Sequence, residues 1–206
     1  MIDEDIEKQL KKIKQEVLVC QKCSLYKNRI YPVIGEGNHQ ARIAFIGEAP
    51  GFSEAKTGHP FCGPSGKILD ELLDSIGIKR QDVYITNLLK DRPPDNRDPE
   101  MEEIKACYPY LKKQIEVIKP GVICLLGRHS MRFLMKKFGL EKEIQPISKI
   151  HGQVFQSNKL LEGVKIIPLY HPAVSVYNVN MRSVLMEDFQ ILKKIKQETN
   201  NYKKIE

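Results

Sequence analysis

The chain has 206 residues, of which 41% are hydrophobic and 29% are charged. This balance is typical of a globular chain with a buried core, and it excludes a disordered chain, a collagen-like repeat and a disulfide-stapled miniprotein. The 33 Lys and Arg residues outnumber the 26 Asp and Glu residues, so the formal net charge is +7. Such a surplus favours a polyanionic partner, nucleic acid first, although solubility alone also explains it. The length predicts one domain over residues 1–206.

The location of the protein is predicted from what the sequence lacks. The first residues, Met1 to Asp5, are acidic and contain no apolar stretch of the signal-peptide kind. No uncharged apolar run approaches the ~18 residues that a membrane span needs. We therefore expect a cytoplasmic protein without membrane contact. The five cysteines cannot all pair, so each needs an explanation as a metal ligand, a core residue or a nucleophile.

Helical and extended patterns alternate along the chain. The amphipathic spacing of apolar residues predicts an N-terminal helix over 3–19. Short apolar runs predict buried strands over 42–47, 83–87, 121–127 and 164–170. Further helices are expected over 64–73, 100–117, 130–138 and 179–197. Clusters of Gly, Pro, Asn and Asp predict loops over 48–63 and 92–99, and the tail over 198–206 is expected to fray.

This alternation predicts an α/β fold. Four strands with helices between them indicate a central, mostly parallel four-stranded sheet with helices on both faces, a three-layer α/β/α arrangement. Such sheets bind ligands at the carboxyl ends of their strands. Three of the four predicted strand ends carry unusual residues, namely Gly47-Glu48, Asn87 and His171. We therefore expect these residues to share one site.

The cysteines divide into three groups. Cys20-x2-Cys23 has the spacing of a metal-ligand pair, and two partly buried thiols are the alternative. Cys107, near a helix start, is a candidate third ligand. Cys124 lies in an apolar strand and is expected in the core. Cys62 lies near the predicted site, where it is either a packing residue or a nucleophile without an evident histidine partner.

Five motifs carry a resemblance to a known family. They are Cys20-x2-Cys23, Gly47-Glu48-Ala49-Pro50-Gly51, Gly58-His59-Pro60-Phe61-Cys62-Gly63 with Gly66-Lys67, Asn87-Leu88-Leu89-Lys90 with Arg92-Pro93-Pro94, and His171-Pro172-Ala173. With these motifs in this order, the chain from Cys20 to Tyr177 resembles the family 4 uracil-DNA glycosylases, the iron–sulfur branch found in archaea and many bacteria. The resemblance implies a DNA repair enzyme that flips uracil out of DNA and hydrolyses its N-glycosidic bond, leaving an abasic site.

The resemblance also implies roles for individual residues. The uracil pocket would contain Gly47, Glu48, Ala49, Pro50, Phe61, Cys62, Asn87 and His171. Phe61 would stack on the base, Asn87 would read N3–H and O4 of uracil, and His171 would donate to O2 as the uracil anion leaves. Taken singly, these three could instead be a core residue, a turn former and an idle loop histidine.

Glu48 completes the implied catalytic set of His171, Glu48 and Asn87. In the best-known glycosylase branch an aspartate activates water at the position of Ala49, so Glu48 is the nearby carboxylate that remains. Glu48 would orient water or only shape its loop. Stabilisation of the leaving uracil could supply most of the acceleration in either case.

The family's cofactor is a 4Fe-4S cluster, and here the implied ligand set departs from the family. Asp91 stands where the family has its fourth cysteine, at the family's spacing from Cys107. The implied ligands are therefore Cys20, Cys23, Asp91 and Cys107, with iron that is more labile because a carboxylate is a harder ligand than a thiolate. A three-iron cluster and a water at the fourth site are the alternatives. We expect the cluster to have a structural role.

DNA contacts are expected from two segments. Ser65, Gly66 and Lys67 open a helix, where Gly63 and Gly66 would leave backbone N–H groups free for a phosphate. In the segment 170–177, Tyr170 would lie against the backbone, with Val174 or Val176 as a wedge in the minor groove. Further candidate phosphate partners are Arg92, Arg97, Arg128 and Arg182.

The expected partner is uracil-containing DNA, single- or double-stranded. A monomer associated with the nucleoid is expected, with a replication sliding clamp as a candidate protein partner. Three other functions stay open: a superfamily member acting on another deaminated base, a non-catalytic DNA-binding iron–sulfur module, and an iron–sulfur electron carrier. Excision from a uracil-containing oligonucleotide would distinguish a uracil-DNA glycosylase from these three alternatives.

Overall fold

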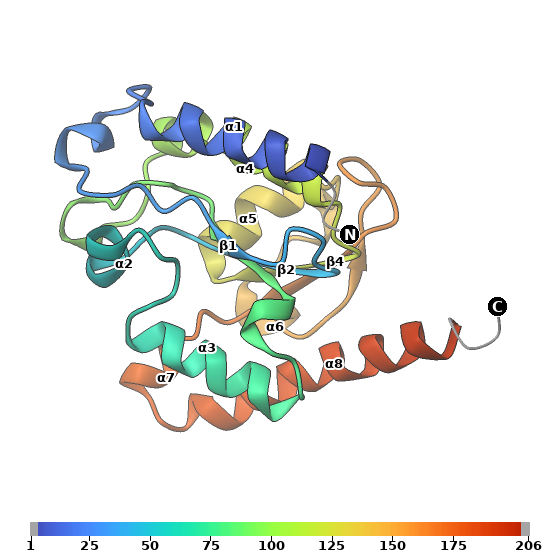
Figure 1. The fold of residues 1–206 in the computed structure, drawn as a ribbon. Coiled ribbons are helices and arrows are strands. Elements are labelled where there is room, and N and C mark those ends of the chain that lie inside the picture. The colour runs from blue at the N-terminus through green and yellow to red at the C-terminus, as the bar shows by residue number, and fades with distance from the viewer. Residues whose placement is uncertain (1–3, 203–206) are drawn as a thin grey trace.

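The computed structural model describes residues 4–202, with the side chains of residues 4–195. Its centre is a six-stranded sheet in the order β1-β3-β2-β4-β6-β5 (Figure 1). The four inner strands are mutually parallel: β3 (Tyr84–Asn87), β2 (Ile43–Gly47), β4 (Val122–Leu126) and β6 (Lys165–Leu169). All four were predicted, and each predicted boundary is confirmed to within one residue. The two-residue strands β1 (Glu36–Gly37) and β5 (Phe155–Gln156) add antiparallel edges that the sequence did not predict.

Helices cover both faces of the sheet, as the alternation predicts. One face carries α1 (Glu4–Leu18), α4 (Met101–Ile118) and α5 (Arg128–Lys137), and the other carries α3 (Pro64–Ser75) and α8 (Met181–Tyr202) (Figure 1). The two-residue period of a strand sends alternate side chains to opposite cores. In β2, for example, Ala44 and Ile46 join the first core while Ile43 and Phe45 join the second. Cys124 is fully buried in the second core, which confirms its predicted place.

The remaining differences from the prediction concern short elements and chain ends. Three short helices were not predicted: α2 (Phe52–Thr57), α6 (Ile147–Ile150) and α7 (Val174–Tyr177). The same holds for the 3₁₀ turns η1 (Ser24–Asn28), η2 (Arg80–Asp82), η3 (Pro94–Asn96) and η4 (Glu141–Glu143). Helix α8 continues to Tyr202, beyond its predicted end at residue 197, and the fraying of the tail stays a prediction, while 203–206 and Asp3 lie outside the described residues. Within residues 4–202, no helix combines the length and apolarity of a membrane-spanning segment.

Candidate active site

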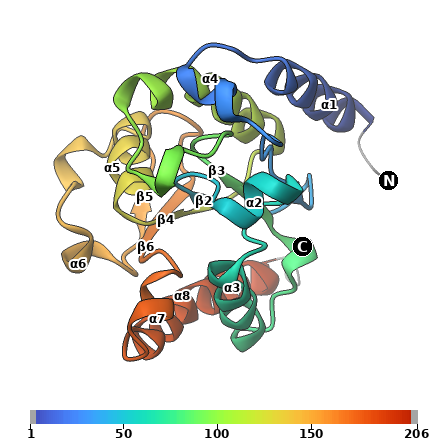
Figure 2. The ribbon, with the colours of Figure 1, turned by 90° about the vertical axis from the view of Figure 1, so that its left-hand side faces the viewer.

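The carboxyl ends of the inner strands open into a cavity of about 310 Å³. Figure 2 shows α2, α3 and α7 around these strand ends. Six of the eight residues expected in the uracil pocket line the cavity: Glu48, Ala49, Pro50, Phe61, Asn87 and His171. As the strand ends predict, the fold brings together side chains that are more than a hundred positions apart in sequence. Gly47 and Cys62 lie outside the lining.

Asn87 presents an unpaired acceptor at the floor of this cavity. The residue closes β3 and is 1% exposed, and among the described residues its Oδ1 has no hydrogen-bond partner. Its backbone is fixed by the sheet, where it pairs with Gly47, and by Lys90 Nζ, which donates to its carbonyl at 2.9 Å. A buried polar atom without a partner is costly, so its presence points to a ligand that supplies a donor.

Gly47 lets the aromatic ring and the amide approach each other. A Cβ at this position would collide with Asn87 Oδ1 and lie 2.8 Å from Phe61 Cζ. Only glycine therefore fits behind the pocket. Gly47 acts through the space that it leaves and does not line the cavity itself.

His171 lies two residues beyond β6, with its ring centroid 5.5 Å from that of Phe61 and an angle of 26° between the ring planes. The backbone N–H of Ala173 donates to His171 Nδ1 at 3.2 Å, so in the neutral ring the proton is on Nε2. Burial lowers the pKa of His171 to about 4, although the nearby Glu54 carboxylate acts in the opposite direction. At neutral pH the cavity therefore contains a neutral imidazole with a fixed Nε2–H donor.

Glu48 belongs to a charged cluster beside the cavity. Burial raises the pKa of its half-buried carboxyl, Asp98 raises it further, and His129 and Arg128 act against this. Ligand atoms of Glu48, Asp98 and His129 lie within 4.8 Å of one another. That spacing also suits a cation, but Arg128 Nη2 already pairs with Asp98 Oδ2 at 2.8 Å and supplies positive charge there. The arrangement suits a carboxylate that orients a water molecule.

Sequence reasoning missed Glu54, which also lines the cavity. The unpredicted helix α2 turns this side chain inward, and its Oε1 accepts the N–H of Gly63 at 2.8 Å. Gly58, at φ 78°, ends α2 in the left-handed conformation that caps helices. Proline and glycine on both sides of a six-residue helix hide it from a periodicity search.

The expectation that Gly63 and Gly66 leave their backbone N–H groups free is wrong. The Gly63 N–H donates to Glu54, and the Gly66 N–H donates to the Gly63 carbonyl at 2.9 Å. Gly66 is required for another reason, since a Cβ there would collide with the Phe61 carbonyl. Ser65 lines the cavity and Lys67 is exposed on the first turn of α3, so both remain available to DNA.

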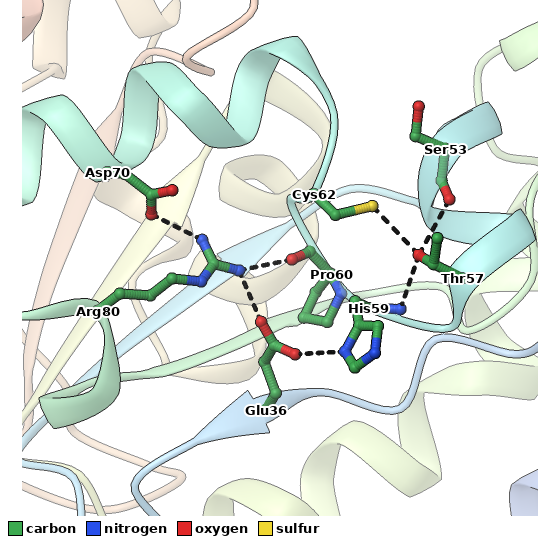
Figure 3. A network of polar contacts seen from close by, with 8 residues as sticks. All are labelled: Glu36, Ser53, Thr57, His59, Pro60, Cys62, Asp70 and Arg80. Carbon is green, nitrogen blue, oxygen red and sulfur yellow. Dashed lines mark hydrogen bonds and ion pairs between the residues drawn. The ribbon is translucent and has the colours of Figure 1, made fainter.

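Two further predicted contacts lie differently from the expectation. The thiol of Cys62 is exposed and points toward Thr57, with Sγ 3.2 Å from Oγ1, as Figure 3 shows. Val174 packs against the second core, whereas Val176 is 43% exposed on α7. Val176 is therefore the better candidate for a wedge. Tyr170 is half-buried, with its ring centroid 4.6 Å from that of His151.

The predicted iron ligands form a second cluster, which we call the cysteine corner (Cys20, Cys23, Asp91 and Cys107). Cys20 and Cys23 follow the end of α1. Cys107 was expected near the start of a helix, but it lies in the interior of α4. All five cysteines are free thiols. Burial raises the pKa of Cys107 to about 11, with Cys23 and Asp91 adding to the effect, and burial likewise raises the pKa of Cys23. The four groups are thus close enough to influence one another's charge.

Arg29, which sequence reasoning did not single out, holds this corner together. Its Nε and Nη2 donate to the two Asp91 carboxylate oxygens, each at 2.7 Å. The same guanidinium donates to the carbonyls of Leu18 and Cys20 at 2.9 and 2.8 Å. The pair is buried, with side chains 13% and 4% exposed. An ionised carboxylate has about four lone-pair sites, so each Asp91 oxygen keeps one for a metal.

The donor types of the corner suit a metal, but the described residues do not form a ready-made ligand group there. Among residues 4–195, no three of the four ligand atoms come within 4.8 Å of one another. Three thiols and a carboxylate are donor types that bind iron or zinc in proteins.

A mostly parallel sheet with a cavity at its strand ends places this protein among the α/β proteins that bind ligands at that edge, and comparisons with known proteins name the family. Residues 34–193 match the model of the uracil DNA glycosylase superfamily. The type-4 uracil-DNA glycosylase of Saccharolobus solfataricus is 50% identical over 182 residues, 88% of this chain and 83% of the relative. That of Archaeoglobus fulgidus is 46% identical over 178 residues (86% and 88%), and that of Sulfurisphaera tokodaii 44% over 187 residues (90% and 84%). The chain therefore belongs to the uracil-DNA glycosylase superfamily, in its type-4 branch.

Proposed function

We propose that the protein removes uracil from DNA by hydrolysing the bond between the base and C1′ of the deoxyribose. Water adds to C1′, the base leaves as the uracil anion and takes up a proton, and an abasic site remains in the strand. The observation that carries this proposal is the unpaired Oδ1 of Asn87, 1% exposed, in a cavity beside an aromatic ring. The cavity is reached by a base outside the helix, so the nucleotide must first flip.

Recognition would rest on Asn87 and Phe61. The Phe61 ring offers a flat face for stacking, and Asn87 Oδ1 accepts N3–H of uracil while Nδ2 donates to O4. Cytosine carries a lone pair at N3 and an amino group at C4. The same amide would therefore place its acceptor Oδ1 against the N3 lone pair and its donor Nδ2 against the amino group. A site built for such hydrogen bonds rejects the wrong partner strongly, because its buried groups are left unpaired.

Acceleration would come mainly from stabilising the leaving base. His171 Nε2–H donates to O2 as negative charge builds there, and the Ala173 N–H at Nδ1 keeps the neutral ring in the tautomer that has this donor. Glu48 orients the attacking water on the side of the Asp98–His129 cluster. With much of the charge on the base and little on the water, Glu48 need not act as a strong base.

DNA would be held around the mouth of the cavity. Ser65 and Lys67 at the start of α3 suit a phosphate, with Gly66 allowing the helix to approach the Phe61 backbone. Val176, which is exposed on α7 next to α3, is the candidate wedge, while Tyr170 and Val174 pack against the second core. A non-catalytic DNA-binding module would have no use for a buried, unpaired amide in a cavity, which is why we favour the enzyme.

The cysteine corner would hold a 4Fe-4S cluster through Cys20, Cys23, Cys107 and Asp91. When bound, the cluster supplies a covalent cross-link between segments far apart in the chain, and ligation of that kind couples to folding. Arg29 keeps Asp91 in place and ties the end of α1 to the loop after β3. A monomeric state, a sliding-clamp partner and a nucleoid-associated cytoplasmic location remain predictions from the sequence.

The direct test uses oligonucleotides with one uracil, single-stranded or opposite G or A, and matched strands with cytosine or thymine at that position. We expect alkali-labile abasic sites from the uracil strands alone. Asn87→Leu, which has a similar volume but no amide, should bind the same DNA and lose selective excision. A folded protein that leaves every uracil strand intact would refute the proposed function.

A further inference from the structure

Phe61 stands in a loop that needs support from outside. Its φ of 50° lies in the left-handed region, which side chains with a Cβ avoid. Such a conformation persists only where the surrounding structure over-determines it. Gly66 fixes one side, because its backbone packs directly against the Phe61 carbonyl. Something must hold the residues that precede Phe61 as well, or the ring would turn out of the cavity.

Arg80, the first residue of η2, provides that second support (Figure 3). Its Nη2 donates to the Pro60 carbonyl at 2.6 Å and to Glu36 Oε1 at 2.8 Å, and its Nη1 donates to Asp70 Oδ1 at 2.9 Å. The other Glu36 oxygen contacts His59 Nδ1 at 2.8 Å. Both residues before Phe61 are therefore tied to one guanidinium–carboxylate network.

The start of the loop is tied to α2 in the same view. Thr57 Oγ1 donates to the Ser53 carbonyl at 3.0 Å and accepts the His59 N–H at 3.3 Å. His59 is thus held from two sides, while Pro60 receives its hydrogen bond from Arg80. The planar fork of an arginine reaches three acceptors on three segments at once, which the single ammonium of a lysine cannot reproduce.

We propose that Arg80 is a positioning residue for uracil excision. By holding the Pro60 carbonyl between Glu36 on β1 and Asp70 on α3, it keeps the Phe61 ring in the plane on which the flipped base stacks. The inference rests on the stacking role proposed for Phe61. Arg80 does not line the cavity, so it acts through the loop and not on the base.

The test compares Arg80→Ala, Arg80→Lys, Phe61→Ala and the Arg80→Ala/Phe61→Ala double variant in single-turnover excision. We expect Arg80→Ala to slow excision by about tenfold to a hundredfold, since misplacement of a positioned group by about 1 Å has effects of that size. Its Kd for DNA with a non-cleavable uracil nucleotide should change by less than about threefold, because ground-state binding draws on many other contacts. Arg80→Lys should restore only part of the rate.

The double variant separates positioning from general stability. If Arg80 acts through Phe61, the double variant is as slow as Phe61→Ala alone. Lys113→Ala, which breaks an ion pair between α4 and Glu16 of α1, is the matched control and should excise at the wild-type rate. Should Arg80→Ala fail to fold, Glu36→Gln carries the same test with a smaller expected loss.

Three results would overturn the inference. If Arg80→Ala excises at the wild-type rate while Phe61→Ala is slow, Arg80 has no positioning role and the stacking role of Phe61 stands. Multiplying effects in the double variant would show that Arg80 acts by another route. Wild-type excision by Phe61→Ala would remove the stacking role and this inference together, while leaving uracil excision itself intact.

Discussion

The strand-end cavity proposed to bind uracil and the cysteine corner are assembled in different ways. The cavity lies where adjacent parallel strands end, and Asn87 of its lining and Gly47 behind it are register partners in the sheet. The cysteine corner draws on the end of α1, the loop after β3 and the interior of α4, with no strand pairing between them. Sheet register positions the first site, and one buried ion pair, Arg29 with Asp91, positions the second.

This difference separates chemistry from stability. The pocket keeps an unpaired amide and a lowered-pKa imidazole, features that reduce stability and serve a ligand. The corner satisfies its charges, since each Asp91 oxygen accepts a hydrogen bond from Arg29. Changes in the pocket should therefore alter excision without lowering stability at neutral pH, and changes in the corner should lower stability with little effect on excision.

The largest expected effect follows from His171→Ala. We expect single-turnover excision to fall by roughly 10²–10³-fold, as the loss of one donor to a developing oxyanion does elsewhere. Binding of uracil DNA should change far less, because the hydrogen bond to O2 strengthens mainly in the transition state. A rate near that of the wild type would remove His171 from the mechanism.

Asn87→Asp should blur the distinction between uracil and cytosine. A protonated carboxyl can donate where the amide oxygen accepted, which suits N3 of cytosine. We expect the preference for uracil to fall by at least about tenfold, measured as the ratio of single-turnover rates on matched strands. If the variant rejects cytosine as strongly as the wild type does, another group shares the reading.

Asp91 variants test the corner. We expect the purified protein to be brown with close to four irons, and Asp91→Cys to lose iron more slowly under oxidant or chelator because thiolate is the softer ligand. Asp91→Ala should yield a three-iron or apo protein and melt at a lower temperature. It also leaves Arg29 buried without its partner. In other proteins, removing one partner of a buried ion pair lowers the free energy of unfolding by roughly 3–5 kcal/mol.

Excision per folded molecule should survive both Asp91 changes, since none of the four corner residues lines the cavity. Iron content, electron paramagnetic resonance and melting of the three proteins provide the readouts. Equal iron retention in the wild type and Asp91→Ala would mean that Asp91 is not a ligand and serves only Arg29.

The smallest effect is a pH dependence of stability. Between the ordinary pKa of 6.5 and the lowered pKa of about 4, the unfolded chain binds a proton at His171 that the folded chain does not. Stability therefore falls as the pH falls through this window, by up to about 3 kcal/mol at 1.36 kcal/mol per pKa unit. His171→Gln should remove this part of the dependence. Urea unfolding of both proteins at pH 7 and pH 4.5 checks it, and parallel pH curves would contradict it.

The parallel strands and the pocket could be predicted because they depend on local patterns. Continuous apolar runs mark buried strands, and Asn87 and His171 stand at their ends. The edge strands β1 and β5 have two residues each, too few for any period. Glu54 was missed because one short helix turns it inward.

Polar pairs between residues far apart in the chain could not be predicted from the sequence. The two residues of the Arg29–Asp91 pair are 62 positions apart, and no spacing rule links them. The same holds for Arg80, whose partners come from β1, α3 and the Phe61 loop. Gly63 and Gly66 near a helix start predict free N–H groups for a phosphate, whereas these N–H groups donate to local acceptors in the structure.

A crystal structure with free uracil bound would test most directly whether the strand-end cavity reads the base. We predict the ring stacked on Phe61, N3 within hydrogen-bond distance of Asn87 Oδ1, and O2 within hydrogen-bond distance of His171 Nε2. Uracil bound elsewhere, or in this cavity with Asn87 Oδ1 still unpaired, would contradict the assignment.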